Sequence, residues 1–167
     1  MELIEALESG RQDFMDAVSG LSESASLLRP APDRWSVVEC IEHVVTVEER
    51  FQGWLEKGSP AASLPNPENE ARLFSVLTDR STRVTAPEAV RPSGRFRTLQ
   101  ESLAGFIAAR DRSLSLVKDR ASNLYTIGAQ HQRFGDLNGV EVVQLIAGHA
   151  RRHAAQIRET RNVVERD

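Results

Sequence analysis

The chain has 167 residues, of which 40% are hydrophobic and 27% are charged, and its formal net charge at pH 7 is −3. This composition is typical of one globular domain, 1–167, large enough to bury a real core. The charge gives no electrostatic footprint for nucleic acid, and no apolar run reaches the roughly 20 residues of a membrane span. Because Cys40 is the only cysteine, an internal disulfide is excluded. We expect a cytoplasmic protein with no nucleic-acid and no membrane partner.

Hydrophobic residues that recur at helical spacing predict four long helices and one short one. In chain order these helices cover about 3–23, 37–57, 67–79, 98–120 and 139–164, the third being the short one. The end of the first helix has two interpretations. Either Gly20 stops it and Ser22 caps a short helix through Leu28, or the first helix runs on to Leu28.

The sharpest local signal is the start of the second long helix. Ser36 and Glu39 have the spacing of a capping box, flanked by Trp35 and Cys40 at the hydrophobic-staple positions. No segment shows sustained alternation of polar and apolar residues, so we expect no sheet, and 121–136 is expected to be a connection. The predicted fold is all-α: a four-helix bundle with a long connection between its second and third helices.

Three of the four histidines fall on apolar helix faces. The inward face of the last helix is predicted to carry Val142, Leu145, Ile146, His149, His153, Gln156 and Ile157, and the outward face Ala147, Arg151, Ala155 and Arg158. The inward face of the second helix is predicted to carry Cys40, His43, Val44, Val47, Phe51 and Trp54. Two histidines four residues apart can converge on one ion, and His43 supplies the third ligand that such a pair needs.

A single inward histidine is more often a structural residue than a metal ligand. Three are different, because burying three unpaired imidazoles would cost several kcal/mol, whereas one divalent ion satisfies all of them. Three neutral nitrogens leave one open position on a tetrahedral ion, which is the arrangement of catalytic zinc. Imidazole ligands suit several transition metals, and zinc or nickel is the expected ion.

Two motifs give the chain a family resemblance. Residues 35–43 read WSxxExxxH, residues 149–157 read HxxxHxxQI, and HQRFG stands between them at 131–135. In this order the motifs resemble the DinB-like superfamily, which includes the bacillithiol transferases, and the resemblance spans nearly the whole chain. It implies a metal-binding four-helix bundle, often a homodimer, whose three ligands match His43, His149 and His153. Residues 58–97 match no functional motif.

Several other residues could act beside the ligands. Glu39, one turn before His43, could bind the other ring nitrogen of that histidine, although a capping box with Ser36 uses the same carboxylate and is favoured. Cys40 could approach the metal, but a cysteine at a staple position is usually part of the core.

Three further residues are weaker candidates. Gln156, one turn beyond His153, could line the cavity or bridge helices. His131 could be catalytic, solvated or capping, and Arg50 could bind an anionic substrate group or form a surface ion pair.

The resemblance implies a metal-dependent transferase that attacks a small electrophilic substrate with a low-molecular-weight thiol as co-substrate. In a close variant the ion activates water for hydrolysis. A non-catalytic metal-stabilised bundle that binds a small molecule or a protein, and a plain bundle without metal, stay open as alternatives.

Overall fold

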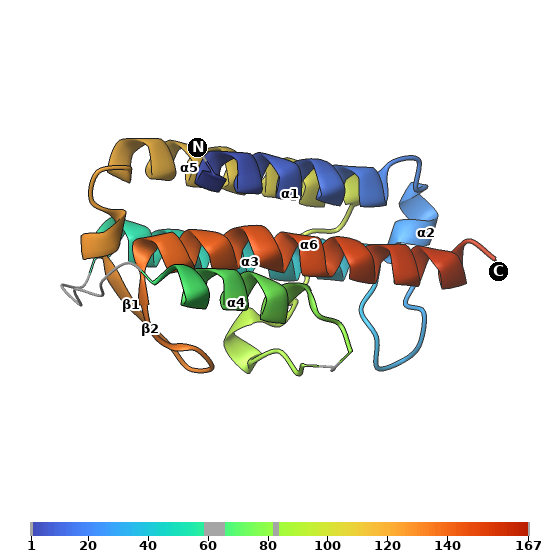
Figure 1. Ribbon diagram of the computed structural model, residues 1–167. Coiled ribbons are helices and arrows are strands. Elements are labelled where there is room, and N and C mark those ends of the chain that lie inside the picture. The colour runs from blue at the N-terminus through green and yellow to red at the C-terminus, as the bar shows by residue number, and fades with distance from the viewer. Residues whose placement is uncertain (1, 59–65, 82–83, 167) are drawn as a thin grey trace.

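The computed structural model describes residues 2–58, 66–81 and 84–166. The elements, in chain order, are α1 (Glu2–Val18), α2 (Glu23–Leu27), α3 (Val37–Lys57), α4 (Pro67–Thr78), the 3-10 turn η1 (Glu88–Val90), α5 (Leu99–Arg120), the 3-10 turn η2 (Leu124–Thr126), β1 (Gly128–His131), β2 (Gly135–Asn138) and α6 (Gly139–Val164). The expectation of a mostly helical bundle is confirmed (Figure 1).

Local sequence explains where the helices begin. Ser36 and Glu39 form the predicted capping box at the start of α3, and Asn138 and Glu141 form a second one at the start of α6. Ser22 caps α2, so the interpretation in which the first helix stops and a short helix follows is the correct one. These caps satisfy backbone N–H groups that have no partner within their own helix.

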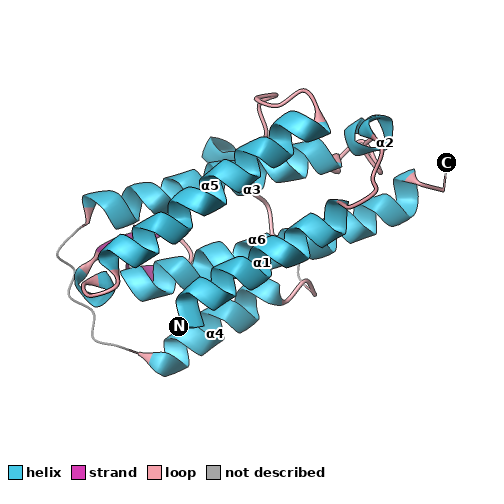
Figure 2. Ribbon diagram, turned by 90° about the horizontal axis from the view of Figure 1, so that it is seen from above, coloured by secondary structure: helices cyan, strands magenta, loops and turns pink. Residues whose placement is uncertain are grey.

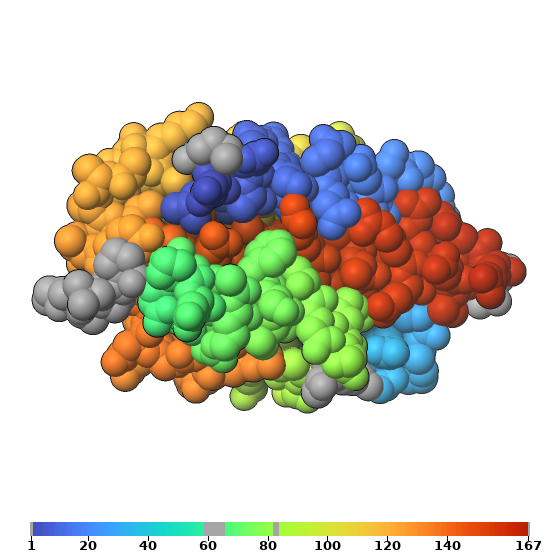
Figure 3. All heavy atoms as spheres, in the orientation of Figure 1, coloured from blue at the N-terminus to red at the C-terminus, as the bar shows by residue number. Residues whose placement is uncertain are grey.

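The long helices α1, α3, α5 and α6 form the bundle. Neighbours pack in the cyclic order α1, α6, α3, α5 and back to α1, while α4 lies outside this ring against α6 (Figure 2). Helix α6 is therefore covered by α1, α3 and α4, and in Figure 3 its surface is a band between α1 and α4. None of the helices that the structure describes is long and apolar enough to cross a membrane.

This central position corrects one prediction. Ala147 was expected on the outward face of the last helix, but it is fully buried. Its carbonyl oxygen would lie 3.2 Å from a Cβ added at Gly10 of α1. A helix with neighbours on three sides buries residues on more than one face. A prediction that divides the helix into one buried and one exposed face is therefore wrong for Ala147.

The expectation of no sheet is wrong. Strands β1 and β2 pair antiparallel, with His131 opposite Gly135 and Gly128 opposite Asn138. The loop between them has three residues and is followed by Gly135 with φ 75°, a conformation that glycine adopts without strain. Each strand is only four residues long and has no Asn-Gly turn, so the alternation and turn signals that predict hairpins are missing.

Candidate metal centre

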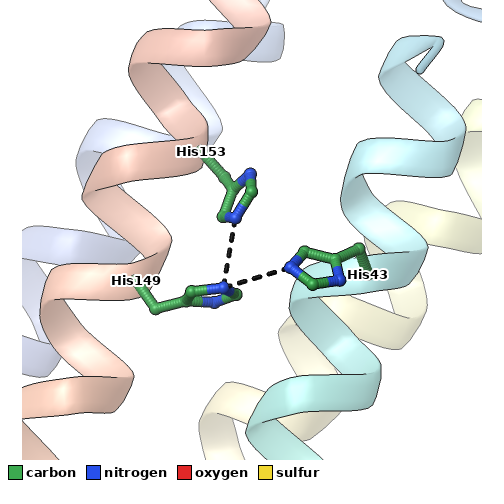
Figure 4. A group of neighbouring side chains, drawn as sticks. All are labelled: His43, His149 and His153. Carbon is green, nitrogen blue, oxygen red and sulfur yellow. Dashed lines mark hydrogen bonds between the residues drawn. The ribbon is translucent and has the colours of Figure 1, made fainter. Parts of the chain in front are cut away.

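The three predicted ligands come together inside the bundle. His43 projects from the second turn of α3, and His149 and His153 project from successive turns of α6, so that the three rings point toward one another (Figure 4). The Nε2 atom of His149 lies 3.2 Å from Nε2 of His43 and 3.1 Å from Nε2 of His153. One ligand atom from each residue lies within 4.8 Å of the others, so the group could hold a metal ion.

Hydrogen bonds on the far side of two rings decide which nitrogens face the centre. Nδ1 of His43 lies 2.6 Å from the carbonyl oxygen of Val90, and Nδ1 of His153 lies 2.9 Å from the amide oxygen of Gln156. Since both oxygens accept, each Nδ1 carries the proton of a neutral imidazole, and each Nε2 presents a lone pair. Nε2 of His149 can carry at most one proton and can donate it to only one of the Nε2 atoms of His43 and His153. The three facing nitrogens therefore have more lone pairs than N–H groups.

That imbalance fits a cation. A tetrahedral ion with ligand bonds near 2.0–2.1 Å separates its nitrogen ligands by about 3.3 Å, which is close to the two short separations in the cluster. Partners on Nδ1 that leave Nε2 free are the usual supports of metal-binding histidines. The residues present therefore fit a divalent transition metal.

Burial keeps the three imidazoles neutral. Burial lowers the pKa of His43, against the opposing effect of its bond to Val90. It lowers the pKa of His149 and of His153 well below the ordinary value; a positive charge on His43 would lower both pKa values further, and the hydrogen bond to Gln156 opposes the shift at His153. Part of the His149 residue is exposed to solvent, although its ring is surrounded closely enough by protein for burial to be the main cause of its lowered pKa. Neutral imidazole is the form that binds metals, so the site is in its ligating state at neutral pH.

Neither Cys40 nor Glu39, the two side chains one turn before His43, supplies a fourth ligand. Sγ of Cys40 lies 3.4 Å from Nδ1 of His153, which is the ring nitrogen facing away from the cluster. The carboxylate of Glu39 accepts from the backbone N–H of Ser36 and pairs with Arg29. Among the described residues, the ligand set at this point is the three histidines alone.

The other candidates have different places. The capping-box interpretation of Glu39 is confirmed, and the atom that binds Nδ1 of His43 is instead the backbone carbonyl of Val90. Sequence reasoning missed it because a carbonyl 47 residues away leaves no residue-type signal. Gln156 does contact His153. The aromatic ring of Trp35 lies 4.8 Å from that of His43, measured between centroids.

His131 lies in the β1–β2 hairpin, whereas Arg50 lies on α3. Nδ1 of His131 accepts hydrogen bonds from the backbone N–H groups of Arg133 at 3.0 Å and Phe134 at 3.3 Å, so this histidine closes the β1–β2 turn. Burial lowers the pKa of His131, and the charges of Arg133 and Arg50 lower it further. Arg50 is exposed. The structure therefore does not bring His131 into the three-histidine cluster.

Fold and site together define a class: helical bundles with three histidines, from two helices, that converge in the core. The family model for the DinB superfamily matches residues 6–157, and the chain belongs to this superfamily. The chain is also similar to the uncharacterized protein YuaE of Bacillus subtilis (strain 168), with 22% identity over 156 aligned residues. The alignment covers 93% of this chain and 95% of YuaE. No solved structure matches the chain significantly.

Proposed function

We propose that the protein is a divalent-metal-dependent transferase that joins a small thiol to an electrophilic substrate. The observation that carries this proposal is the convergence of three Nε2 atoms, two of which are held as lone-pair donors by Val90 and Gln156. Three nitrogen ligands and no fourth one from Cys40 or Glu39 are typical of catalytic sites, because structural zinc sites are closed by four protein ligands.

A bound zinc or nickel ion would supply an open position at which a small thiol is held as its thiolate. The protein's own residues hold the neutral histidines in place, because the Val90 carbonyl and the Gln156 amide oxygen each accept from an Nδ1–H. In the overall reaction a sulfur–carbon bond forms, the bond from carbon to the leaving group breaks with its electron pair, and the thiol proton passes to solvent. Trp35 lies beside His43 and is suited to contact an apolar part of the substrate.

Metal content tests the first half of the proposal. Protein purified without a histidine tag or added metal should contain about one transition-metal ion per chain by elemental analysis. His149→Ala and His153→Ala should lose it, because two ligands are too few. His131→Ala is the matched control, since this histidine lies in the hairpin, and it should keep the metal. Full metal in the His149 and His153 variants would show that the ion is held elsewhere.

Thiol dependence tests the second half. With a low-molecular-weight thiol such as cysteine, the loaded protein should accelerate the loss of an activated aryl chloride above its uncatalysed rate, with a thioether and chloride as products. Loss of an ester substrate in water alone would support the hydrolase instead. If metal is present but the protein accelerates neither reaction, the ion serves a structural role in a binding protein.

A further inference from the structure

Glu42, the residue before His43, is a buried carboxylate held by one short segment of chain. It is 2% exposed. Its Oε1 accepts from the backbone N–H of Ser93 at 2.6 Å and from the Ser93 hydroxyl at 3.1 Å, and its Oε2 accepts from the backbone N–H of Arg95 at 3.0 Å. Hydrogen bonds to an ionised acceptor are stronger than neutral ones. Glu42 therefore fastens residues 93–95 to helix α3.

The segment is shaped for this contact. Gly94, between the two backbone donors, has φ 85°, and a turn of this kind lets successive N–H groups face one anion. The guanidinium of Arg95 pairs with both carboxylate oxygens of Glu49, at 2.6 and 2.8 Å, two helical turns farther along α3. The segment is thus anchored at two points along one helix.

The same segment carries the partner of His43. Val90 lies three residues before Ser93, and its carbonyl oxygen accepts from Nδ1 of His43 at 2.6 Å. Three residues of chain span at most about 10 Å, so fixing Ser93 and Arg95 restricts where the Val90 carbonyl can lie. The position of that carbonyl decides which ring nitrogen of His43 carries the proton.

We propose that Glu42 is a positioning residue of the metal centre. By clasping residues 93–95 it holds the Val90 carbonyl on Nδ1 of His43, and so keeps the Nε2 lone pair of His43 aimed at the site. The expected effect of Glu42 on metal affinity rests on the proposed function. The expected effect of Glu42 on the tautomer of His43 does not depend on any metal.

The test compares two buried carboxylates of the same helix. In Glu42→Gln, one amide oxygen can still accept from Ser93, but the NH2 group then opposes the Arg95 N–H. Glu48→Gln is the matched control, because Glu48 is also 2% exposed but binds Arg110 and Ser113 of α5 instead. Circular dichroism selects conditions in which both variants are folded.

Two measurements report the effect. In metal-free protein, nitrogen-15 NMR of the histidine side chains should show Nδ1-protonated His43 in the wild type and in Glu48→Gln, and a mixture of tautomers in Glu42→Gln. Zinc affinity, measured by chelator competition, should fall about tenfold or more in Glu42→Gln, the usual loss when a ligand's supporting group is removed. In Glu48→Gln it should fall by much less than in Glu42→Gln, because Glu48 hydrogen-bonds to α5 and not to the 90–95 segment.

A second pair of variants serves if Glu42→Gln does not fold. Gly94→Ala strains the turn through its positive φ alone, since a Cβ there meets no atom within 4 Å. Gly20→Ala carries the same kind of strain at φ 73°, also in open space, but between α1 and α2. Only Gly94→Ala should shift the His43 tautomer and weaken zinc binding.

Three results would overturn the inference: an unchanged tautomer and zinc affinity in folded Glu42→Gln, equal weakening by Glu48→Gln, or equal effects of the two glycine variants. If wild-type protein binds no zinc, the proposed function fails. The tautomer in the metal-free protein then still decides whether Glu42 positions His43.

Discussion

Cys40 shows how closely a thiol can approach this centre without being able to join it. Its sulfur lies beside His153, but on the Nδ1 side of the ring, while the ring's other nitrogen faces the cluster. Burial raises the pKa of the Cys40 thiol to about 12, against a small opposing effect of the charge on Arg80. A buried neutral thiol of this kind packs as a small apolar side chain.

The native protein should therefore resist alkylation at Cys40. At pH 8 a thiol with a pKa about four units higher is ionised in roughly one molecule in ten thousand, and only the thiolate reacts. We expect intact-mass spectrometry to show no carbamidomethyl group after iodoacetamide treatment of native protein, and complete modification in urea. Rapid labelling of protein with a native circular dichroism spectrum would place the thiol in contact with solvent.

At the scale of the element, α3 carries buried polar groups on more than one face. His43 faces α6, while Glu48 and Gln52 contact α5. The Arg110 guanidinium donates to both oxygens of Glu48, at 2.8 and 2.9 Å, and to the carbonyl of Leu7 on α1. Arg110 and Glu48 are 0% and 2% exposed. This pair therefore links α1, α3 and α5 at one level of the bundle.

Removing one partner of this pair should be much worse than removing both. Arg110→Met leaves the Glu48 carboxylate buried and uncompensated, and we expect the free energy of unfolding to fall by about 3–5 kcal/mol. The double variant Arg110→Met/Glu48→Met should recover most of this loss, because apolar side chains of similar volume replace the ions. Urea denaturation of the single and double variants measures both effects. Equal stability of the two would mean that the charges are not coupled.

The helices and the histidine cluster could be predicted from the sequence. The bounds of α3, α5 and α6 follow from hydrophobic spacing and from caps at Ser36, Thr98 and Asn138. The grouping of three histidines follows from placing each on an apolar face. The helix bounds and the histidine grouping both depend on the spacing of residues within single helices, which can be read from the sequence.

What the sequence does not reveal depends on contacts between distant segments. Arg110 and Glu48 are charged residues that ordinarily lie at the surface, and their mutual pairing, together with bonds to Leu7 and Ser113, allows their burial. The Val90 carbonyl is a backbone atom, so no residue type marks it. Ala147 is buried because α1 covers that side of α6, which a helix-by-helix reading cannot anticipate.

Across the whole molecule, the apolar core of the described residues falls into two parts. One part contains Leu7, Val47 and Leu145, and the other contains Phe14, Val44 and Ala154. Along α5 the change of cluster falls between Ala109 and Leu114, where Arg110 and Ser113 lie, and along α6 it falls between Ala147 and Ala150, on either side of His149. Buried polar groups such as the Arg110–Glu48 pair favour one register of the helices, because a slip would leave them without partners.

The three inward histidines should make the metal-free protein sensitive to mild acid. Burial lowers the pKa values of His43, His149 and His153 in the folded state, while in the unfolded chain they return to about 6.5. Below pH 6.5 the unfolded chain binds protons that the folded protein does not. Stability is therefore fully present above this pH and is lost as the pH falls toward the folded-state values, by up to about 1.4 kcal/mol per pH unit for each histidine.

Urea unfolding at pH 7.5, 6.5 and 5.5 measures this loss before most carboxylates titrate. The variant His149→Leu/His153→Leu should lose much less stability over the same range, because its two most strongly shifted imidazoles are gone. His131→Leu is the comparison for a histidine in the hairpin, and it should keep most of the wild-type dependence, since His131 is only partly buried. A wild-type stability that stays level between pH 7.5 and 5.5 would contradict the burial of neutral imidazoles, since protonation would then be equally easy in both states.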